Sequence, residues 1–318
     1  MAVEHTMQLG EAAITRVVEW SGPLKTVGEI LPESGPEQWK AHRGLLAPDF
    51  WDPTTDAYLC HIQTWVVRIG GRTILIDTGV GNDRDRPQIP PLADLHTDFL
   101  DRLAATGVEP ADVDTVINTH IHYDHVGWNT RLVDGAFVPT FPNATYLVPA
   151  VDYDYFHPHH AENMRAPETE DERRRFAGTT LVFNDSIRPI EQAGQLQLWR
   201  DHHGLPGLPI SLEAAPGHTP GSSVAVLDQA AGALFVGDLL HSPLQFLYPD
   251  LRCSFDLDPA QARATRQRLL ARAATTGALV LPAHLGGHSA ATLSTDTDTD
   301  TEFAVQQWAS FPRQQPPR

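Results

Sequence analysis

The segment 119–125 (THIHYDH) most constrains how this chain folds, because it places three histidines and an aspartate within six consecutive residues. It directly follows residues 113–118 (VDTVIN), which the apolar pattern predicts to be a buried strand. Side chains alternate along extended backbone, so His120 and His122 point to the same side. Neutral imidazole is the commonest metal ligand in proteins. The pair therefore predicts half of a metal site at the end of a strand.

Three further candidate ligands also follow predicted strands. They are His218 in the turn PGHTPG, Asp238 in FVGD and His284 in VLPAH. Each could serve alone as a turn or cap residue, but strand ends on one rim of a sheet are where layered α/β proteins build their sites. Asp124 and His125 lie at the turn after the first pair and can serve a second metal. Together these residues predict a metal centre whose ligands come from segments far apart in the sequence.

Composition limits the classes of protein that the chain can represent. It has 318 residues, 41% of them hydrophobic, which predicts one large domain or two small ones. No apolar run is long enough to span a membrane, and the N-terminus lacks a signal-peptide pattern, so we expect a cytoplasmic protein with no membrane partner. The net charge of −17 repels phosphate backbones and argues against a nucleic-acid partner. Cys60 and Cys253 are far apart and are expected to be buried rather than paired.

Strand and helix patterns alternate along the chain. Residues 60–69 and 72–77 predict a hairpin, because Gly70-Gly71 between them is a two-residue turn signal. Helical spacing of apolar residues predicts a helix over 92–106 and another over 259–273. The other predicted strands are 13–20, 113–118, 145–148, 196–199, 210–215, 223–228, 233–236 and 278–281.

No linker divides this pattern, so residues 1–290 are predicted to form a single domain. Residues 152–175 are polar and predict an insertion that covers one face, with His157, His159 and His160 on a surface helix. The Asp/Thr run at 294–302 lacks a glycine that would shape a calcium loop. Residues 291–318 are therefore interpreted as a low-complexity linker followed by a terminal segment.

Taken in order, these motifs resemble those of the metallo-β-lactamase-fold hydrolases. The resemblance spans about residues 60–290 and is carried by five motifs that occur in order along the chain. The first is Ile76-Asp77-Thr78-Gly79, which matches the family's structural aspartate, and the other four are His120-x-His122-x-Asp124-His125, Gly217-His218, Gly237-Asp238 and Ala283-His284. The resemblance implies an α/β fold built as an αββα sandwich.

The resemblance also implies a binuclear metal site. In that reading His120, His122 and His218 hold the first metal, Asp124, His125 and His284 hold the second, and Asp238 bridges both. Zinc suits these nitrogen and carboxylate ligands best, and iron, manganese or cobalt are chemically acceptable. Two such ions share a hydroxide that acts as the nucleophile. Asp77 is interpreted as orienting a ligand imidazole or its loop.

The ligand set and the charge favour one branch of the family. A bridging Asp238 distinguishes the chain from true β-lactamases, and a histidine at 122 argues against the diiron branch. The net charge argues against the nuclease branches, and the acidic C-terminal region argues against the glyoxalase-like branch. The chain therefore looks most like the lactonase and organophosphate-hydrolase branch. Quorum-signal lactonases have a tyrosine three residues after the bridging aspartate, where this chain has His241, and this favours the methyl-parathion-hydrolase-like subgroup.

The sequence thus predicts a binuclear metal-dependent hydrolase of small esters, lactones or phosphotriesters. Its predicted catalytic residues are Asp124, Asp238 and His241. His241 either hydrogen-bonds the substrate or donates a proton to the leaving group, or is only a polar turn residue. The alternatives are a thioesterase or an amide-ring-opening hydrolase on the same scaffold, and a metal-binding protein without turnover. The expected partners are a small-molecule substrate and, by resemblance, a second copy of the chain in a homodimer.

Overall fold

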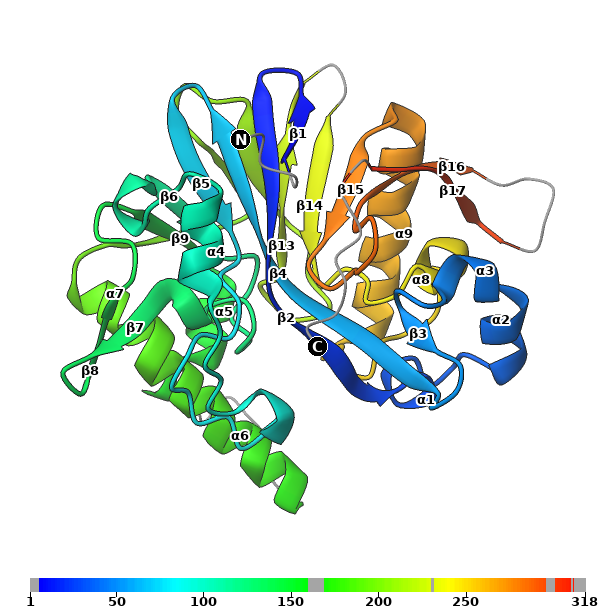
Figure 1. Ribbon diagram of the computed structural model, residues 1–318, viewed down its shortest axis with the longest axis horizontal. Helices are drawn as coiled ribbons and strands as arrows, with labels where there is room; N and C mark the ends of the chain where they lie inside the picture. Colours follow the sequence, from blue (N-terminus) through cyan, green and yellow to red (C-terminus); the bar gives the residue numbers. More distant parts are fainter. Residues whose placement is uncertain (1–5, 160–168, 230–231, 296–300, 310, 312–318) are drawn as a thin grey trace.

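The computed structural model describes residues 6–159, 169–229, 232–295, 301–309 and 311. Within these residues two β-sheets face each other and helices cover their outer sides (Figure 1). This is the predicted αββα sandwich.

The first sheet contains eight strands in the described part of the chain. Its order is β1-β2-β4-β5-β6-β9-β10, with β3 paired to β4. The strands are β1 Thr6–Leu9, β2 Ala12–Thr26, β3 Trp51–Asp52, β4 Ala57–Ile69, β5 Arg72–Ile76, β6 Thr115–Ile117, β9 Thr145–Pro149 and β10 Leu196–Trp199.

The second sheet contains seven strands in the described residues, in the order β11 to β17. They are β11 His202–Gly204, β12 Ile210–Ala214, β13 Ser223–Leu227, β14 Ala233–Gly237, β15 Leu279–Pro282, β16 Ala291–Thr295 and β17 Phe303–Trp308. A separate hairpin pairs β7 (Thr130–Val133) with β8 (Ala136–Pro139).

The helices lie outside and between these strands. They are α1 Val27–Ile30, α2 Pro36–Ala41, α3 Arg43–Leu46, α4 Phe99–Ala105, α5 Ala150–Phe156, α6 Glu170–Val182, α7 Arg188–Gln192, α8 Leu244–Leu247 and α9 Pro259–Thr276. The predicted cap of α9 is present, since the Asp258 side chain accepts a hydrogen bond from the backbone N–H of Gln261.

Alternating side chains build three apolar layers. In β4, Trp65 and Val67 enter the core between the two sheets, whereas Val66 faces outward against Phe99 of α4. In the second sheet, the outward face packs in the same way on α9, which lies along it in Figure 1. Sheet faces buried on both sides explain why the strands read as continuous apolar runs in the sequence.

The candidate ligands all follow strand ends at one edge of this sandwich. β5, β6 and β9 run parallel in the first sheet, as do β14 and β15 in the second. The segment 119–125 follows β6, Asp238 follows β14 and His284 follows β15. Because parallel strands end at the same edge, the topology brings these segments together.

The predicted helix over 92–106 is shorter in the structure. A 3-10 turn at Pro90–Leu92 is followed by a non-helical stretch, and α4 begins only at Phe99. The backbone N–H of Thr97 donates to Asn82 Oδ1 (2.8 Å), and the Asn82 amide donates to the Thr97 carbonyl (3.0 Å). These side chain to backbone bonds fix the stretch to the loop after β5 and outcompete the helical pattern.

The C-terminal prediction also differs from what is observed. Residues 291–295, assigned to a linker, form β16, and β17 pairs with it antiparallel. Ala291, Leu293 and Phe303 bury their side chains against the second sheet's outer core. Most of the Asp/Thr run, residues 296–300, lies outside the described residues. The sheet therefore continues beyond the predicted boundary at residue 290.

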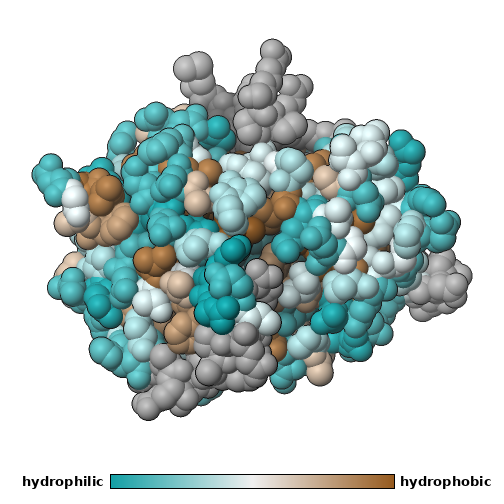
Figure 2. Space-filling view, turned by 90° about the horizontal axis from the view of Figure 1, so that it is seen from below, coloured by the Kyte–Doolittle hydropathy of each residue, from teal (hydrophilic) through white to brown (hydrophobic). Residues whose placement is uncertain are grey.

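The surface is predominantly polar on the face seen in Figure 2, where hydrophobic residues form small groups separated by hydrophilic ones. No helix among the described residues combines the length and the apolar character needed to cross a membrane. Cys60 and Cys253 are both buried, as predicted.

Candidate metal centre

The structure brings all seven predicted ligands into two adjacent groups. The first ligand group contains His120, His122, His218 and Asp238, and the second contains Asp124, His125 and His284. Within each group the ligand atoms lie within 4.8 Å of one another. A third group, Asp238, His241 and His284, overlaps these two.

Asp238 lies between the two groups and presents one carboxylate oxygen to each. Oδ1 lies 2.9 Å from His284 Nε2 and 3.1 Å from His125 Nε2, both in the second group. Oδ2 lies 3.2 Å from His218 Nε2 in the first group. A carboxylate with this orientation can bind two cations at once, one through each oxygen.

The imidazoles of the first group approach one another through their ring nitrogens. His122 Nδ1 lies 3.0 Å from both His120 Nε2 and His218 Nε2. Burial lowers the pKa of His120 and of His122 well below the usual value. Both rings are therefore neutral, which is the protonation state that a metal ligand requires.

The second ring nitrogen of several ligands is held by an acceptor. His125 Nδ1 donates to Asp77 Oδ2 (2.8 Å), and His284 Nδ1 donates to the carbonyl of His61 (2.8 Å). Asp77 also accepts from the backbone N–H of Thr119 (2.8 Å), so it orients both a ligand and the loop. Such outer contacts fix the tautomer of a ligating histidine and the direction of its ring.

Asp256 orients a histidine of the first group, His218, in the same way. The sequence alone did not identify this residue. Its Oδ1 lies 3.2 Å from His218 Nδ1, and its Oδ2 accepts from the backbone N–H of Cys253 (3.0 Å) and from Arg266 (3.4 Å). The pKa of Asp256 is lowered because the contact with His218, with help from Arg266, outweighs burial. The local sequence signal for Asp256 is its position as an acidic residue two positions before Asp258, the N-cap of α9.

Two glycines allow the ligand loops to approach closely. Gly237 has φ +50°, and a Cβ there would lie 2.7 Å from Thr119 Oγ1. Gly217 has φ +137°, and a Cβ there would collide with the backbone of Ala262 in α9. A larger residue before Asp238 or His218 would therefore push its ligand loop outward.

Electrostatics at the centre favour a bound cation. Burial opposes charge on His218, but the carboxylate of Asp238 raises the pKa of that ring to about 9. Likewise the pKa values of His125 and His284 rise well above normal despite burial, because Asp238 faces both rings. The imidazoles in turn hold the pKa of Asp238 well below its usual range against the effect of burial. Divalent cations satisfy the same negative field when they replace these protons.

The residues present fit such cations. Within the described residues, His125 Nε2 and Asp238 Oδ1 are buried and form no hydrogen bond, although they lie 3.1 Å from each other. Buried polar atoms without a partner are costly in a folded protein. Imidazole nitrogens and carboxylate oxygens converging in this way form a ligand set suited to zinc.

His241 belongs to neither the first nor the second ligand group. It forms a third, overlapping cluster with Asp238 and His284, whose ligand atoms also lie within 4.8 Å of one another. Its Nε2 lies 3.2 Å from Asp238 Oδ2, and its ring stacks on that of His284 with centroids 5.5 Å apart. Tyr58 donates to its carbonyl (3.0 Å), and its backbone N–H donates to Gln245 Oε1 (2.7 Å). Its buried Nδ1 has no hydrogen-bond partner among the described residues. Burial lowers the pKa of this ring.

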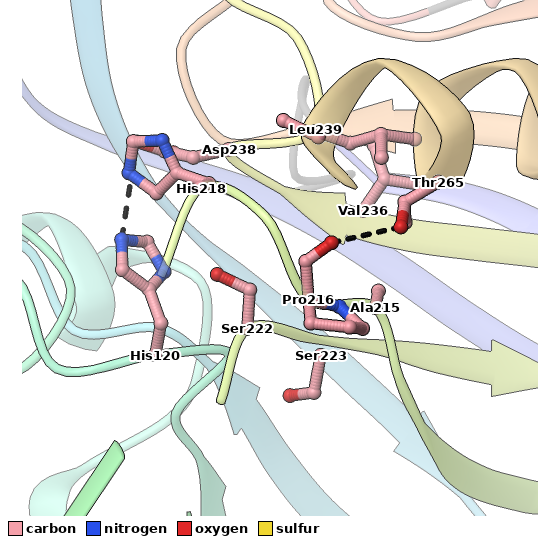
Figure 3. A pocket seen from close by; sticks show the side chains of 11 residues that line it. His120, Ala215, Pro216, His218, Ser222, Ser223, Val236, Asp238, Leu239 and Thr265 are labelled. Carbon is pink, nitrogen blue, oxygen red and sulfur yellow. Dashed lines mark hydrogen bonds and ion pairs between the residues drawn. The ribbon is translucent and has the colours of Figure 1, made fainter. Parts of the chain in front are cut away.

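A small pocket extends from the first ligand group toward α9 (Figure 3). His120, His218 and Asp238 form one end, and Ser222 lies next to them, whereas Thr265 lies toward the helix. Thr265 Oγ1 donates to the carbonyl of Pro216 (2.8 Å) and so fastens the turn that carries His218 to α9. Apart from the ligand residues, the pocket is lined by uncharged side chains.

The histidines of the predicted insertion lie apart from the centre. His157 follows the end of α5, and the backbone N–H of His159 donates to His157 Nδ1 (3.1 Å). Neither belongs to a metal-ligand group among the described residues. His160 lies outside the described residues.

Comparison with known proteins places this geometry in a family. A model of the metallo-beta-lactamase superfamily matches residues 57–284. The N-acyl homoserine lactonase AttM of Agrobacterium fabrum (strain C58 / ATCC 33970) is 37% identical over 65 residues, which cover 20% of this chain and 21% of that protein. The chain thus spans about a fifth of the length of the curated relatives it matches.

Solved structures share the fold over nearly the whole chain. The hydrolase AbOPH of the beta lactamase superfamily superposes with a TM-score of 0.77 at 23% identity, covering 98% of both chains. AidC, a dizinc quorum-quenching lactonase solved with a product, has a TM-score of 0.69 at 20% identity, covering 95% of this chain and 97% of its own.

Proposed function

The chain belongs to the metallo-beta-lactamase superfamily, and on that premise we propose that it is a binuclear metal-dependent hydrolase. Its proposed substrates are small esters, lactones or phosphotriesters, and zinc is the favoured metal. The first ligand group would hold one ion and the second group the other, with Asp238 shared between them.

The orientation of Asp238 is the observation that carries this proposal. Its Oδ2 faces the nitrogen of His218 and its Oδ1 faces that of His284, at 3.2 and 2.9 Å. A site for a single ion would need only one of these oxygens. Oδ1 and His125 Nε2 are buried, lie 3.1 Å apart and form no hydrogen bond among the described residues, which supports a second ion on this side of Asp238.

When bound, two divalent ions would supply an activated water and would polarise the carbonyl or phosphoryl oxygen of the substrate, whose carbon or phosphorus atom is attacked. The chain's own residues hold that arrangement rigid. Asp77 fixes the ring of His125 and Asp256 fixes that of His218. His122 is the only partly exposed member of the first group, so substrate would approach the centre from its side.

His241 is the proposed proton donor or hydrogen-bond partner for the substrate. Its ring is fixed by Asp238 through Nε2, while Nδ1 remains without a partner among the described residues. Burial lowers the pKa of this ring and so favours its neutral form, which carries a single N–H. The ring donates to the substrate when that N–H is on Nδ1, whereas the tautomer that donates to Asp238 from Nε2 leaves Nδ1 as an acceptor. The hydrogen bonds of the His241 backbone with Tyr58 and Gln245 keep the ring in place.

The substrate class is supported by two observations. AttM, the relative that matches over a short segment, is named as an N-acyl homoserine lactonase, and AidC is described as a lactonase with two zinc ions. The net charge of −17 favours neutral over anionic substrates. The homodimer and the cytoplasmic location stay predictions.

A substrate panel tests the proposed activity. Zinc-loaded protein is given a lactone, an aryl ester and a phosphotriester, with a thioester and a cyclic amide as comparison compounds. We expect hydrolysis of at least one of the first three, with kcat/KM at least tenfold above that for the comparison compounds. Preference for the thioester or the cyclic amide would contradict the proposed class, and no turnover with two ions bound would contradict the enzyme assignment.

Replacing His241 by phenylalanine should lower kcat by roughly 100-fold, the usual effect of removing a general acid. Zinc content should stay unchanged, because the seven proposed ligands remain. The matched control His203→Phe changes a histidine of the edge strand β11 and should leave kcat unaltered. Unchanged turnover of His241→Phe on all substrates would show that His241 is only a structural residue.

A further inference from the structure

One buried carboxylate joins the two chain segments that carry the first ligand group. Asp152 of α5 is fully buried. Its Oδ2 accepts from the backbone N–H of Ile121 (3.0 Å) and from Thr219 Oγ1 (2.8 Å), and its Oδ1 accepts from the backbone N–H of Gly221 (2.6 Å). Ile121 lies between His120 and His122, and Thr219 follows His218. The one side chain therefore holds the backbone beside all three imidazoles of that group.

The turn after His218 is packed directly on this carboxylate. A Cβ at Gly221 would collide with the backbone N–H of Asp152. The connection also crosses between the sheets, because Ile121 follows β6 of the first sheet and Thr219 follows β12 of the second. Asp152 thus fixes the distance between the two segments from outside the ligand set.

A buried arginine holds the chain around His284 in a similar way. Arg16 of β2 is 1% exposed. Its Nη1 donates to the carbonyl of Gly287 (2.8 Å) and its Nη2 to that of Leu285 (3.3 Å), just after the ligand. Its Nε donates to Gln63 Oε1 (2.6 Å). These acceptors are all neutral.

Gln63 completes the support on the other side of the ligand. Its Nε2 donates to the carbonyl of Pro282 (3.0 Å) and to Ser289 Oγ (2.7 Å). Arg16 and Gln63 therefore hold both flanks of His284, which belongs to the second ligand group and not to the first. Burying a guanidinium costs desolvation free energy. Because Arg16 is buried and donates to the loop after His284, we infer that the position of this loop matters for the centre.

We propose that Asp152 and Arg16 are positioning residues that act on separate halves of the metal centre. Asp152 sets the geometry of the first ligand group across the two sheets, and Arg16 sets the position of His284 in the second. The inference rests on the proposed binuclear centre. It predicts that the two metal-binding steps can be weakened one at a time without touching a ligand.

The test is a zinc titration of the whole chain against a competing chromophoric chelator. In Asp152→Ala one binding step should weaken by roughly 10 to 100-fold, the usual cost of removing a partner that orients metal ligands. Arg16→Met should weaken the other step by a similar factor. In each variant the unaffected step should stay within about twofold of its original affinity.

The histidine ring nitrogen that binds zinc identifies which of the two zinc-binding steps has occurred. His122 faces its group through Nδ1, whereas His125 and His284 face theirs through Nε2. Spectra of protein with nitrogen-15 histidine and one equivalent of zinc should therefore show an Nδ1-bound histidine in Arg16→Met. The same signal should be absent in Asp152→Ala.

Two matched controls separate positioning from general damage. Asp114 accepts a hydrogen bond from the backbone N–H of Thr73 (2.7 Å), and Arg272 pairs with Glu213 (2.7 Å), both away from the centre. Asp114→Asn and Arg272→Met should leave both zinc steps unchanged. If either main variant fails to fold, Asp152→Asn or Arg16→Lys replaces it and should show the same selectivity with a smaller factor.

Equal weakening of both steps, or no change in either, would overturn the assignment of Asp152 and Arg16. An Nδ1-bound histidine in Asp152→Ala would overturn it as well. Fewer than two zinc ions in the unaltered protein would instead overturn the proposed centre, and with it this assignment. One titration series therefore distinguishes failure of the Asp152 and Arg16 assignment from failure of the proposed binuclear centre.

Discussion

Replacing Asp238 by alanine is expected to reduce the metal content from two ions to about one and to lower hydrolysis by about 1,000-fold. Asp238 is the residue that faces both ligand groups, with His284 Nε2 2.9 Å from Oδ1 and His218 Nε2 3.2 Å from Oδ2. Its removal would leave several buried imidazoles without their common counter-charge. Elemental analysis and kcat/KM on the preferred substrate measure the two effects in the same sample.

The variant Asp238→Asn is the matched control for this change. It keeps the size of the side chain and one oxygen but loses the charge and the second ligand oxygen. We expect it to keep more metal than Asp238→Ala while losing most of the activity. Full activity with two ions retained in Asp238→Ala would contradict the bridging role.

Removal of the metal should abolish hydrolysis and destabilise the fold. A ligand that binds only the native state contributes about 4 kcal/mol when its free concentration is a thousandfold above Kd. For a chain of this size that corresponds to a fall in Tm of about 6 °C. Activity and thermal unfolding before and after chelator treatment measure both effects.

Reloading provides the control for the chelator experiment. Addition of excess zinc to the treated protein should restore both activity and Tm, and the same chelator saturated with zinc should have no effect. Hydrolysis that persists in protein shown to be free of metal would contradict a metal-dependent mechanism.

The candidate ligands could be predicted from the sequence because each one has a local signature. His120 and His122 alternate on extended backbone, and His218, Asp238 and His284 each follow an apolar run that is long enough for a buried strand. Parallel strands end at one edge, so their order along the chain was sufficient to predict that they meet. The structure brings them into two groups within 4.8 Å.

The residues that hold these ligands could not be found in the same way. Asp256 contacts His218 across 38 residues, and Arg16 contacts Gly287 across 271. Neither has a spacing or neighbour that marks its role. Asp152 was assigned to a polar insertion because the segment after it is rich in charge, yet its own carboxylate is fully buried. Their roles depend on tertiary contacts that no window of sequence contains.

A buried glutamate in β2, Glu19, is another residue whose role could not be predicted from the sequence. Glu19 of β2 accepts from the backbone N–H groups of Val80 (2.6 Å) and Gly81 (3.0 Å) and from the indole of Trp128 (2.6 Å). It thereby fixes the loop that follows Asp77. In the sequence it is one acidic residue in an apolar strand, which predicts an exposed position rather than a buried acceptor.

The number of metal ions per chain, measured by elemental analysis of protein saturated with zinc and freed of excess, tests the central claim most directly. The account predicts about two ions, because Asp238 presents one oxygen to each of two complete ligand groups. A value of one would contradict the binuclear centre. A value below one, after reloading with either zinc or manganese, would contradict the metal centre altogether.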